Sequence, residues 1–170
     1  FAFKILMENN NYAQVNLPED FSICDDIVKT AIIKEICSFN LPIGENLDDY
    51  SNLMLSAISK AKINLVSDEQ IDSTAKTDTQ IQEFKTIFNL YKTKLKELSL
   101  LDYDDLLIYA VKLLKTSKQT AEFYQEKFKY IIEDEAQDSS PIQQELIKLC
   151  IEYNKEVDYL LLYFMFKSLF

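Results

Sequence analysis

The sequence has no arginine, no histidine and, in 170 residues, a single glycine, Gly44. One glycine cannot form a Gly-rich loop, whose backbone amides cradle phosphate groups in many proteins. Without histidine, zinc sites made of cysteine and histidine are effectively excluded. Because every basic residue is a lysine, the chain has no arginine finger for phosphoryl transfer. These absences limit the kinds of phosphate or zinc site that the chain can build by itself.

Charge and cysteine content narrow the class of protein further. The net charge of −10 argues against a surface that binds nucleic acid over its whole extent, but does not exclude a local basic strip. Cys24, Cys37 and Cys150 are far apart and lack metal-like spacing, so we expect buried, reduced thiols in a cytoplasmic protein. From the first residues we expect no signal peptide, and we expect no membrane span from the apolar tail 157–170, which is short.

Apolar residues at helical spacing predict that most of the chain is α-helical. The clearest helix is Thr79–Ser99, in which apolar residues recur at alternating steps of three and four. Two earlier helices, one after the cap Asp25 and one over Leu47–Leu65, also have apolar stripes. The stripe residues that we expect to be buried are Val28, Ile32, Ile36 and Phe39 in the first of these, and Tyr50, Leu53, Ala57, Ile58 and Ala61 in the second.

Other local signals place the remaining elements. Asp20–Cys24 is expected to be extended, and residues 9–16 form a polar break. Further helix starts are predicted at the capping box Ser67–Gln70, at the N-cap Asp102, near Gln119, and at Ser140 with Pro141 in the first helical position. The acids after Asp102 favour the positive end of a helix, and this structural role explains them fully.

Four lysines lie on the outer faces of the helix Thr79–Ser99, with no acid between the first and the last. They are Lys85, Lys92, Lys94 and Lys96. A solvated helix face is the default interpretation, and a strip that contacts nucleic-acid phosphates is the more specific one.

The densest group of acids follows the one strong strand-like run of the chain. Tyr130–Ile132 is apolar and rich in β-branched residues, and the acidic segment Glu133–Asp138 comes directly after it. A buried strand that ends in carboxylates is where nucleotide enzymes hold Mg²⁺ and activate a water molecule. The alternative is a solvated acidic turn between the strand and the helix that starts at Ser140.

Several segments resemble one family in the same order. Tyr130–Ser139 resembles motif II, the Walker B box, of the UvrD/Rep/PcrA-type superfamily-one DNA helicases. Leu101–Leu106 is similar to that family's Asp-Phe-Asp-Asp-Leu box, at about the family's spacing, and Phe123–Tyr130 is similar to its lead-in to motif II. Phe21–Asp25 and Ser56–Lys62 resemble parts of its helical insertion subdomain.

The resemblance implies a role for each polar residue of the Walker B box. Asp134 would bind the Mg²⁺ of Mg-ATP, and Glu135, also beside the metal, would orient and polarise the attacking water. Gln137 would sense the γ-phosphate and couple hydrolysis to DNA, and Asp138 would support the site. Catalysis is thus expected of Glu135 and Gln137, nucleotide binding of all four, and metal binding of Asp134 and Glu135.

The implied fold is mainly α: a helical insertion subdomain, residues 1–98, joined to an incomplete RecA-like α/β piece with one or two strands, residues 99–170. The parent would be an ATP-dependent helicase that moves 3′ to 5′ on DNA and unwinds it in repair or replication. Its partners would be a junction of single-stranded and duplex DNA and the remaining parts of the motor. The family's phosphate loop and its second motor domain are missing here, so we expect a fragment that does not hydrolyse ATP alone.

Two other interpretations remain open from the residues themselves. The chain could be a non-enzymatic, acidic, helical interaction module whose acidic segment only caps a helix. A carboxylate-bridged two-metal site in a helical bundle has little support, because such sites usually use histidine.

Overall fold

The computed structural model describes residues 1–76, 78–128, 131, 133 and 136–151. The chain forms two compact units. Unit 2 is the continuous stretch Leu17–Leu106, and unit 1 combines Phe1–Asn16 with Leu107–Phe170. Unit 2 is therefore inserted into the sequence of unit 1, and its boundaries differ from the division at residues 98 and 99 that the sequence suggested.

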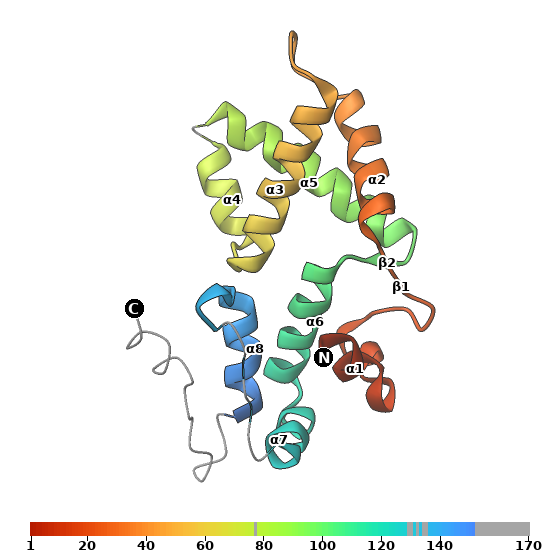
Figure 1. Cartoon of the computed structure of the whole chain (residues 1–170), viewed down its shortest axis with the longest axis vertical. Helices are drawn as coiled ribbons and strands as arrows, with labels where there is room; N and C mark the ends of the chain where they lie inside the picture. The colour runs from red at the N-terminus through yellow and green to blue at the C-terminus, as the bar shows by residue number, and fades with distance from the viewer. Residues whose placement is uncertain (77, 129–130, 132, 134–135, 152–170) are drawn as a thin grey trace. The chain divides into compact units, whose positions relative to one another are not determined.

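Unit 2 is a group of helices closed by one pair of short strands (Figure 1). Its helices are α2 (Asp26–Ser38), α3 (Leu47–Ile63), α4 (Asp68–Ala75) and α5 (Thr79–Glu97), and its strands are β1 (Ser22–Ile23) and β2 (Leu100–Leu101). The strands pair in parallel, with Ser22 opposite Leu100. The predicted extended segment at residues 20–24 is thus confirmed for Ser22 and Ile23.

Side-chain caps fix where these helices begin. Asp25 accepts a hydrogen bond from the backbone N–H of Val28 at 2.8 Å, as the sequence predicted. Ser67 and Gln70 form a complete capping box at the start of α4. Each cap satisfies amide groups that the first turn of a helix leaves without a partner.

The core of unit 2 lies where α2, α3 and α5 pack together. Its fully buried members include Ile33, Cys37 and Tyr91. The predicted stripes are partly wrong: the side chain of Phe39 is 84% exposed and that of Leu53 is 60% exposed. Ile33 and Met54 are buried in the positions that the stripes missed. Helical periodicity shows that a helix has an apolar side, but the neighbouring helices decide which edge of that side is covered.

Unit 1 is also helical. It contains α1 (Ala2–Met7), the 3₁₀ helix η1 (Glu8–Val15), most of α6 (Tyr103–Thr116), α7 (Lys118–Lys127), the 3₁₀ helix η2 (Ala136–Asp138) and α8 (Pro141–Ile151). The expected polar break at residues 9–16 is instead η1, interrupted at Asn9 and Asn10, whose φ angles are 55° and 58°. Asparagine adopts this left-handed conformation more readily than most residues. The buried amide of Asn11 then donates to the carbonyl of Ile5 at 2.9 Å.

The fold class is the predicted one, mainly α with an incomplete α/β piece. Of the predicted strand at residues 130–132, the structure describes only Ile131, which has no regular secondary structure. Tyr130 and Ile132 lie outside the described residues. The tail 157–170 is outside them too. Within the described ranges, no helix combines the length and the hydrophobicity needed to cross a membrane.

Candidate functional site

The predicted Walker B residues are divided between described and undescribed parts of the chain. Asp134 and Glu135 lie outside the described residues. Gln137 and Asp138 lie in η2, a single 3₁₀ turn, and both side chains are exposed. The roles expected of these four residues therefore remain predictions.

The helix that follows the acidic segment is firmly placed within unit 1. Pro141 is the first residue of α8, and the backbone N–H of Ser140 donates to the side-chain oxygen of Gln143 at 2.8 Å. One buried face of α8, with Ile142 and Cys150 fully enclosed, anchors it. Burial also raises the pKa of the Cys150 thiol to about 11, so this thiol stays protonated at neutral pH.

Two polar contacts add to this anchoring. The side-chain amide of Gln125 in α7 donates to the carbonyl of Leu149 at 2.8 Å. Lys115 in α6 forms an ion pair with Glu145 in α8 at 2.7 Å. The last residues of the predicted Walker B box are thus followed directly by a helix that contacts both α6 and α7.

Carboxylate oxygens are the ligands that Mg²⁺ prefers, so the donor set of Asp134 and Glu135 fits this metal. Among the residues that the structure describes, no three acidic or cysteine side chains are grouped closely enough to hold a metal ion. The two metal ligands that the sequence predicts, Asp134 and Glu135, lie outside the residues that this search covers.

A buried ionic cluster inside unit 2 was not foreseen. The ammonium of Lys62, at the end of α3, lies 2.7 Å from a carboxylate oxygen of Asp102 and 2.7 Å from one of Asp105. The hydroxyl of Tyr91 in α5 donates to Asp102 at 3.0 Å. The whole of Lys62 is only 5% exposed and Asp102 only 3%. We call Lys62, Tyr91, Asp102 and Asp105 the Lys62 cluster.

The two acids of the Lys62 cluster have opposite pKa shifts. Burial acts to raise the pKa of Asp102, but the attraction of Lys62 and the hydrogen bonds from Lys62 and Tyr91 outweigh it, so the pKa lies below its usual value. Burial raises the pKa of Asp105 to about 6, against the attraction of Lys62 and with help from the charge of Asp102. Two carboxylates share one ammonium here, and the less well bonded carboxylate retains a proton more easily.

The Asp-rich box therefore does more than cap a helix. Asp102 is the predicted N-cap of α6 and accepts from the backbone N–H of Asp105 at 2.9 Å, but it also binds a lysine forty residues away in sequence. One sequence signal could have revealed this partner. Tyr50, Met54, Ile58 and Lys62 follow one another at steps of four and are all buried, so a lysine continues an apolar stripe. Such a lysine needs an acid opposite it.

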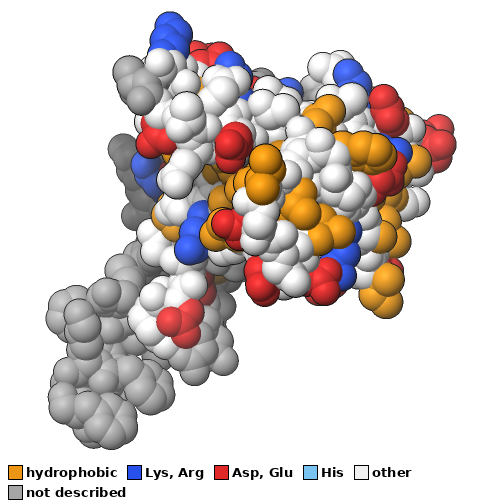
Figure 2. Space-filling model, turned by 90° about the horizontal axis from the view of Figure 1, so that it is seen from above, with side chains coloured by type: hydrophobic (Ala, Val, Ile, Leu, Met, Phe, Trp, Pro, Cys, Tyr) orange, Lys and Arg blue, Asp and Glu red, His pale blue; other side chains and the backbone are white. Residues whose placement is uncertain are grey.

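Three of the four lysines on α5 have acidic partners within unit 2. Lys85 pairs with Asp72 at 2.9 Å and Lys92 with Asp68 at 2.8 Å. Lys94 lies 3.5 Å from Glu35. On the face that Figure 2 presents, lysines are scattered among acidic and hydrophobic side chains. Contact between these lysines and DNA remains a prediction.

The sequence of the chain is similar to that of known DNA helicases. The family model described as UvrD/REP helicase N-terminal domain matches residues 1–165. The chain is 32% identical over 142 residues to the ATP-dependent DNA helicase Rep of Salmonella typhimurium. The aligned region covers 82% of this chain and 20% of that protein. The chain is 30% identical over 139 residues to the ATP-dependent DNA helicase PcrA of Staphylococcus epidermidis. Here the aligned region covers 80% of this chain and 18% of that protein. The chain thus spans about a fifth of the length of these relatives.

Proposed function

The chain belongs to the UvrD/REP helicase N-terminal domain family, and on this premise we propose that it is a segment of an ATP-dependent DNA helicase. The observation that carries the proposal is the family match over residues 1–165. That match includes both the Asp-rich box and the acidic segment. It also favours the helicase over a non-enzymatic acidic module, for which no contact in the described residues gives separate support.

The inserted arrangement of the two units fits this assignment. The sequence leaves unit 1 after Asn16 and returns to it at Leu107. We assign unit 2 to the helical insertion subdomain and unit 1 to part of the RecA-like motor domain. This assignment moves the proposed subdomain boundary from residue 98 to residues 17 and 106.

We assign the chemistry to the acidic segment. Mg²⁺ bound with ATP would neutralise charge on the phosphates during their transfer. In the proposed site, Asp134 would hold this metal, and Glu135 would orient the attacking water and accept its proton. Gln137 would sense the γ-phosphate, and Asp138 would support the other side chains. In the parent, which we place in the cytoplasm, turnover at this site drives 3′-to-5′ movement along single-stranded DNA and unwinding at a duplex junction.

The test is Glu135→Gln in a longer protein that also contains the phosphate loop and the second motor domain. The substitution keeps the size of the side chain and removes its ability to accept a proton. We expect DNA-stimulated ATP hydrolysis to fall by a factor of about 100 or more, while binding of ATP is retained. Coupled-enzyme measurement of phosphate release reads this directly.

Glu133→Gln is the matched control, since it removes the same kind of charge two residues earlier. We expect it to leave hydrolysis within about twofold. Equal loss of activity in both variants would contradict the assignment of the base to Glu135. ATP turnover by the 170-residue chain alone that Glu135→Gln abolishes would support Glu135 as the base, but it would contradict the expectation that this chain does not hydrolyse ATP by itself.

A further inference from the structure

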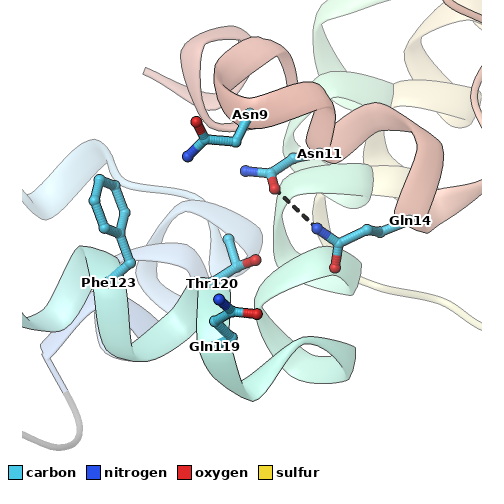
Figure 3. A pocket seen from close by; sticks show the side chains of 6 residues that line it. All are labelled: Asn9, Asn11, Gln14, Gln119, Thr120 and Phe123. Atoms are coloured by element: carbon cyan, nitrogen blue, oxygen red, sulfur yellow. Dashed lines mark hydrogen bonds between the residues drawn. The ribbon is translucent and has the colours of Figure 1, made fainter.

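Unit 1 contains a hollow that the proposed ATP chemistry does not use. It has a volume of about 300 Å³ and is lined by Asn9, Asn11, Gln14, Gln119, Thr120 and Phe123. Figure 3 shows that η1 supplies one wall and α7 the other, with the Phe123 ring standing at the edge. None of the six lining side chains is ionisable. The volume is at the low end for pockets that bind small molecules, roughly 300–1,000 Å³.

Part of this lining is already bonded and forms the frame of the hollow. Asn11 is 4% exposed and accepts from the amide of Gln14 at 2.9 Å, the contact that is dashed in Figure 3. Thr120 is 8% exposed, and its hydroxyl lies 2.8 Å from that of Ser117. Each of these bonds orients side chains within its own wall of the hollow.

The remaining lining offers free recognition groups. The side-chain amides of Asn9 and Gln119 have no hydrogen-bond partner in the described part of the chain, and each has a donor and an acceptor. Phe123 is 42% exposed, and the ammonium of Lys127 lies over its ring, 4.7 Å from the centroid. Lys127 also pairs with Glu8 at 2.9 Å, so its charge is balanced within unit 1.

We propose that this hollow binds one unpaired nucleobase of single-stranded DNA, stacked on Phe123 and hydrogen-bonded by the amides of Asn9 and Gln119. An uncharged, planar group with donors and acceptors on its edge matches an aromatic ring flanked by amides. Bases stack on aromatic side chains in proteins that bind single strands, and asparagine or glutamine can form paired hydrogen bonds with adenine. The choice of DNA as the source of the base rests on the proposed function.

This site would bind the base and not the phosphates, and that difference makes it testable. Contacts with phosphates release counterions and make affinity depend on salt, whereas stacking in an uncharged hollow adds affinity at every salt concentration. Phe123 should therefore contribute to the affinity for DNA without contributing to the slope of log affinity against log salt concentration.

The experiment measures binding of fluorescently labelled, single-stranded oligodeoxyadenylate to the 170-residue chain by anisotropy, without ATP. Phe123→Ala should weaken binding about tenfold, as expected for one lost stacking contact, and leave the salt slope unchanged. Phe123→Tyr should restore binding, because it keeps an aromatic face. Gln119→Ala tests the amide, since Gln119 lies on a helix that tolerates alanine. Asn9 is a poor target because its φ of 55° would strain alanine.

Two controls keep the outcomes distinct. Phe39→Ala removes another exposed phenylalanine, 84% exposed and in unit 2, and should leave binding unchanged. An oligomer of the same length with abasic sugars keeps the phosphates, and Phe123→Ala should not alter its binding.

The proposal is overturned if the chain does not bind oligodeoxyadenylate, if Phe123→Ala has no effect, or if it weakens both oligomers equally. Free deoxyadenosine that displaces the strand at low concentration would reassign the hollow to a nucleoside. None of these results depends on ATP turnover, which tests the proposed function separately.

Discussion

Lys62 shows how one residue of α3 can contact both α5 and the first turn of α6. Its ammonium binds the two acids at the start of α6 and lies 5.2 Å from the centroid of the Tyr91 ring of α5. A charge this deeply buried is tolerated only because its hydrogen-bonding groups meet partners. With both acids ionised, the Lys62 cluster carries one excess negative charge, and this excess gives unit 2 a pH dependence.

We predict that Asp105 makes the free energy of unfolding fall as pH rises from about 4 to about 6. The pKa of Asp105 is about 6 in the folded protein and about 3.9 in an unfolded chain. The folded state therefore binds more protons than the unfolded state in this pH window. The stabilisation that results is lost as the pH rises through the pKa of Asp105 in the folded state. The pKa difference corresponds to about 3 kcal/mol at most.

Asp105→Asn should remove this contribution, because an amide does not titrate. Urea unfolding of both proteins at several pH values, followed by circular dichroism, measures the difference. Asp104→Asn is the matched control, since Asp104 is the adjacent acid and bonds to Ser59, not to Lys62. The pKa assignment is wrong if the curves of wild type and Asp105→Asn stay parallel between pH 4 and pH 6.

At the scale of elements, helix starts were predictable and helix faces were less so. Asp25, Ser67, Asp102 and Pro141 begin helices where the sequence placed them, because a cap depends on residues close in sequence. The exposed Phe39 and the buried Lys62 were not foreseen, because burial depends on helices that are distant in sequence. The same reason limits the prediction for the acidic segment, because its own residues do not show which distant parts of the chain would lie beside it.

The capping box of α4 offers a direct test of such local signals. Ser67→Ala removes the acceptor for the backbone N–H of Gln70, now at 3.2 Å. We expect a loss of about 1 kcal/mol in the free energy of unfolding, measured by chemical denaturation. Ser67→Asp supplies another capping oxygen and should recover most of the loss. If Ser67→Asp is as unstable as Ser67→Ala, the cap does not stabilise α4 as described.

At the scale of the whole molecule, the insertion of unit 2 into unit 1 could not be predicted from local patterns. Residues 1–16 belong with a segment that begins ninety residues later, and no periodicity reports such a distant pairing. Unit 2, by contrast, contains its own apolar core, its own caps and the entire Lys62 cluster.

We therefore predict that residues 17–106 fold without the rest of the chain. The isolated segment should show helical circular dichroism and a single cooperative thermal transition. Ile33→Asn, which places an amide at a fully buried core position, should abolish that transition and serves as the control. A broad, non-cooperative melt of the unmodified segment would show that unit 2 depends on unit 1.

The pairing of β1 with β2 has a consequence for how such proteins can be rebuilt. The backbone N–H of Ser22 donates to the carbonyl of Ser99 at 2.9 Å, and that of Cys24 to the carbonyl of Leu101 at 2.8 Å. The segment that enters unit 2 and the segment that leaves it therefore lie side by side, at the distance that separates neighbouring strands of a sheet. The residues between these two strands could therefore be replaced by another domain whose termini lie close together, or by a short linker peptide. Neither replacement would require the two strands to move apart.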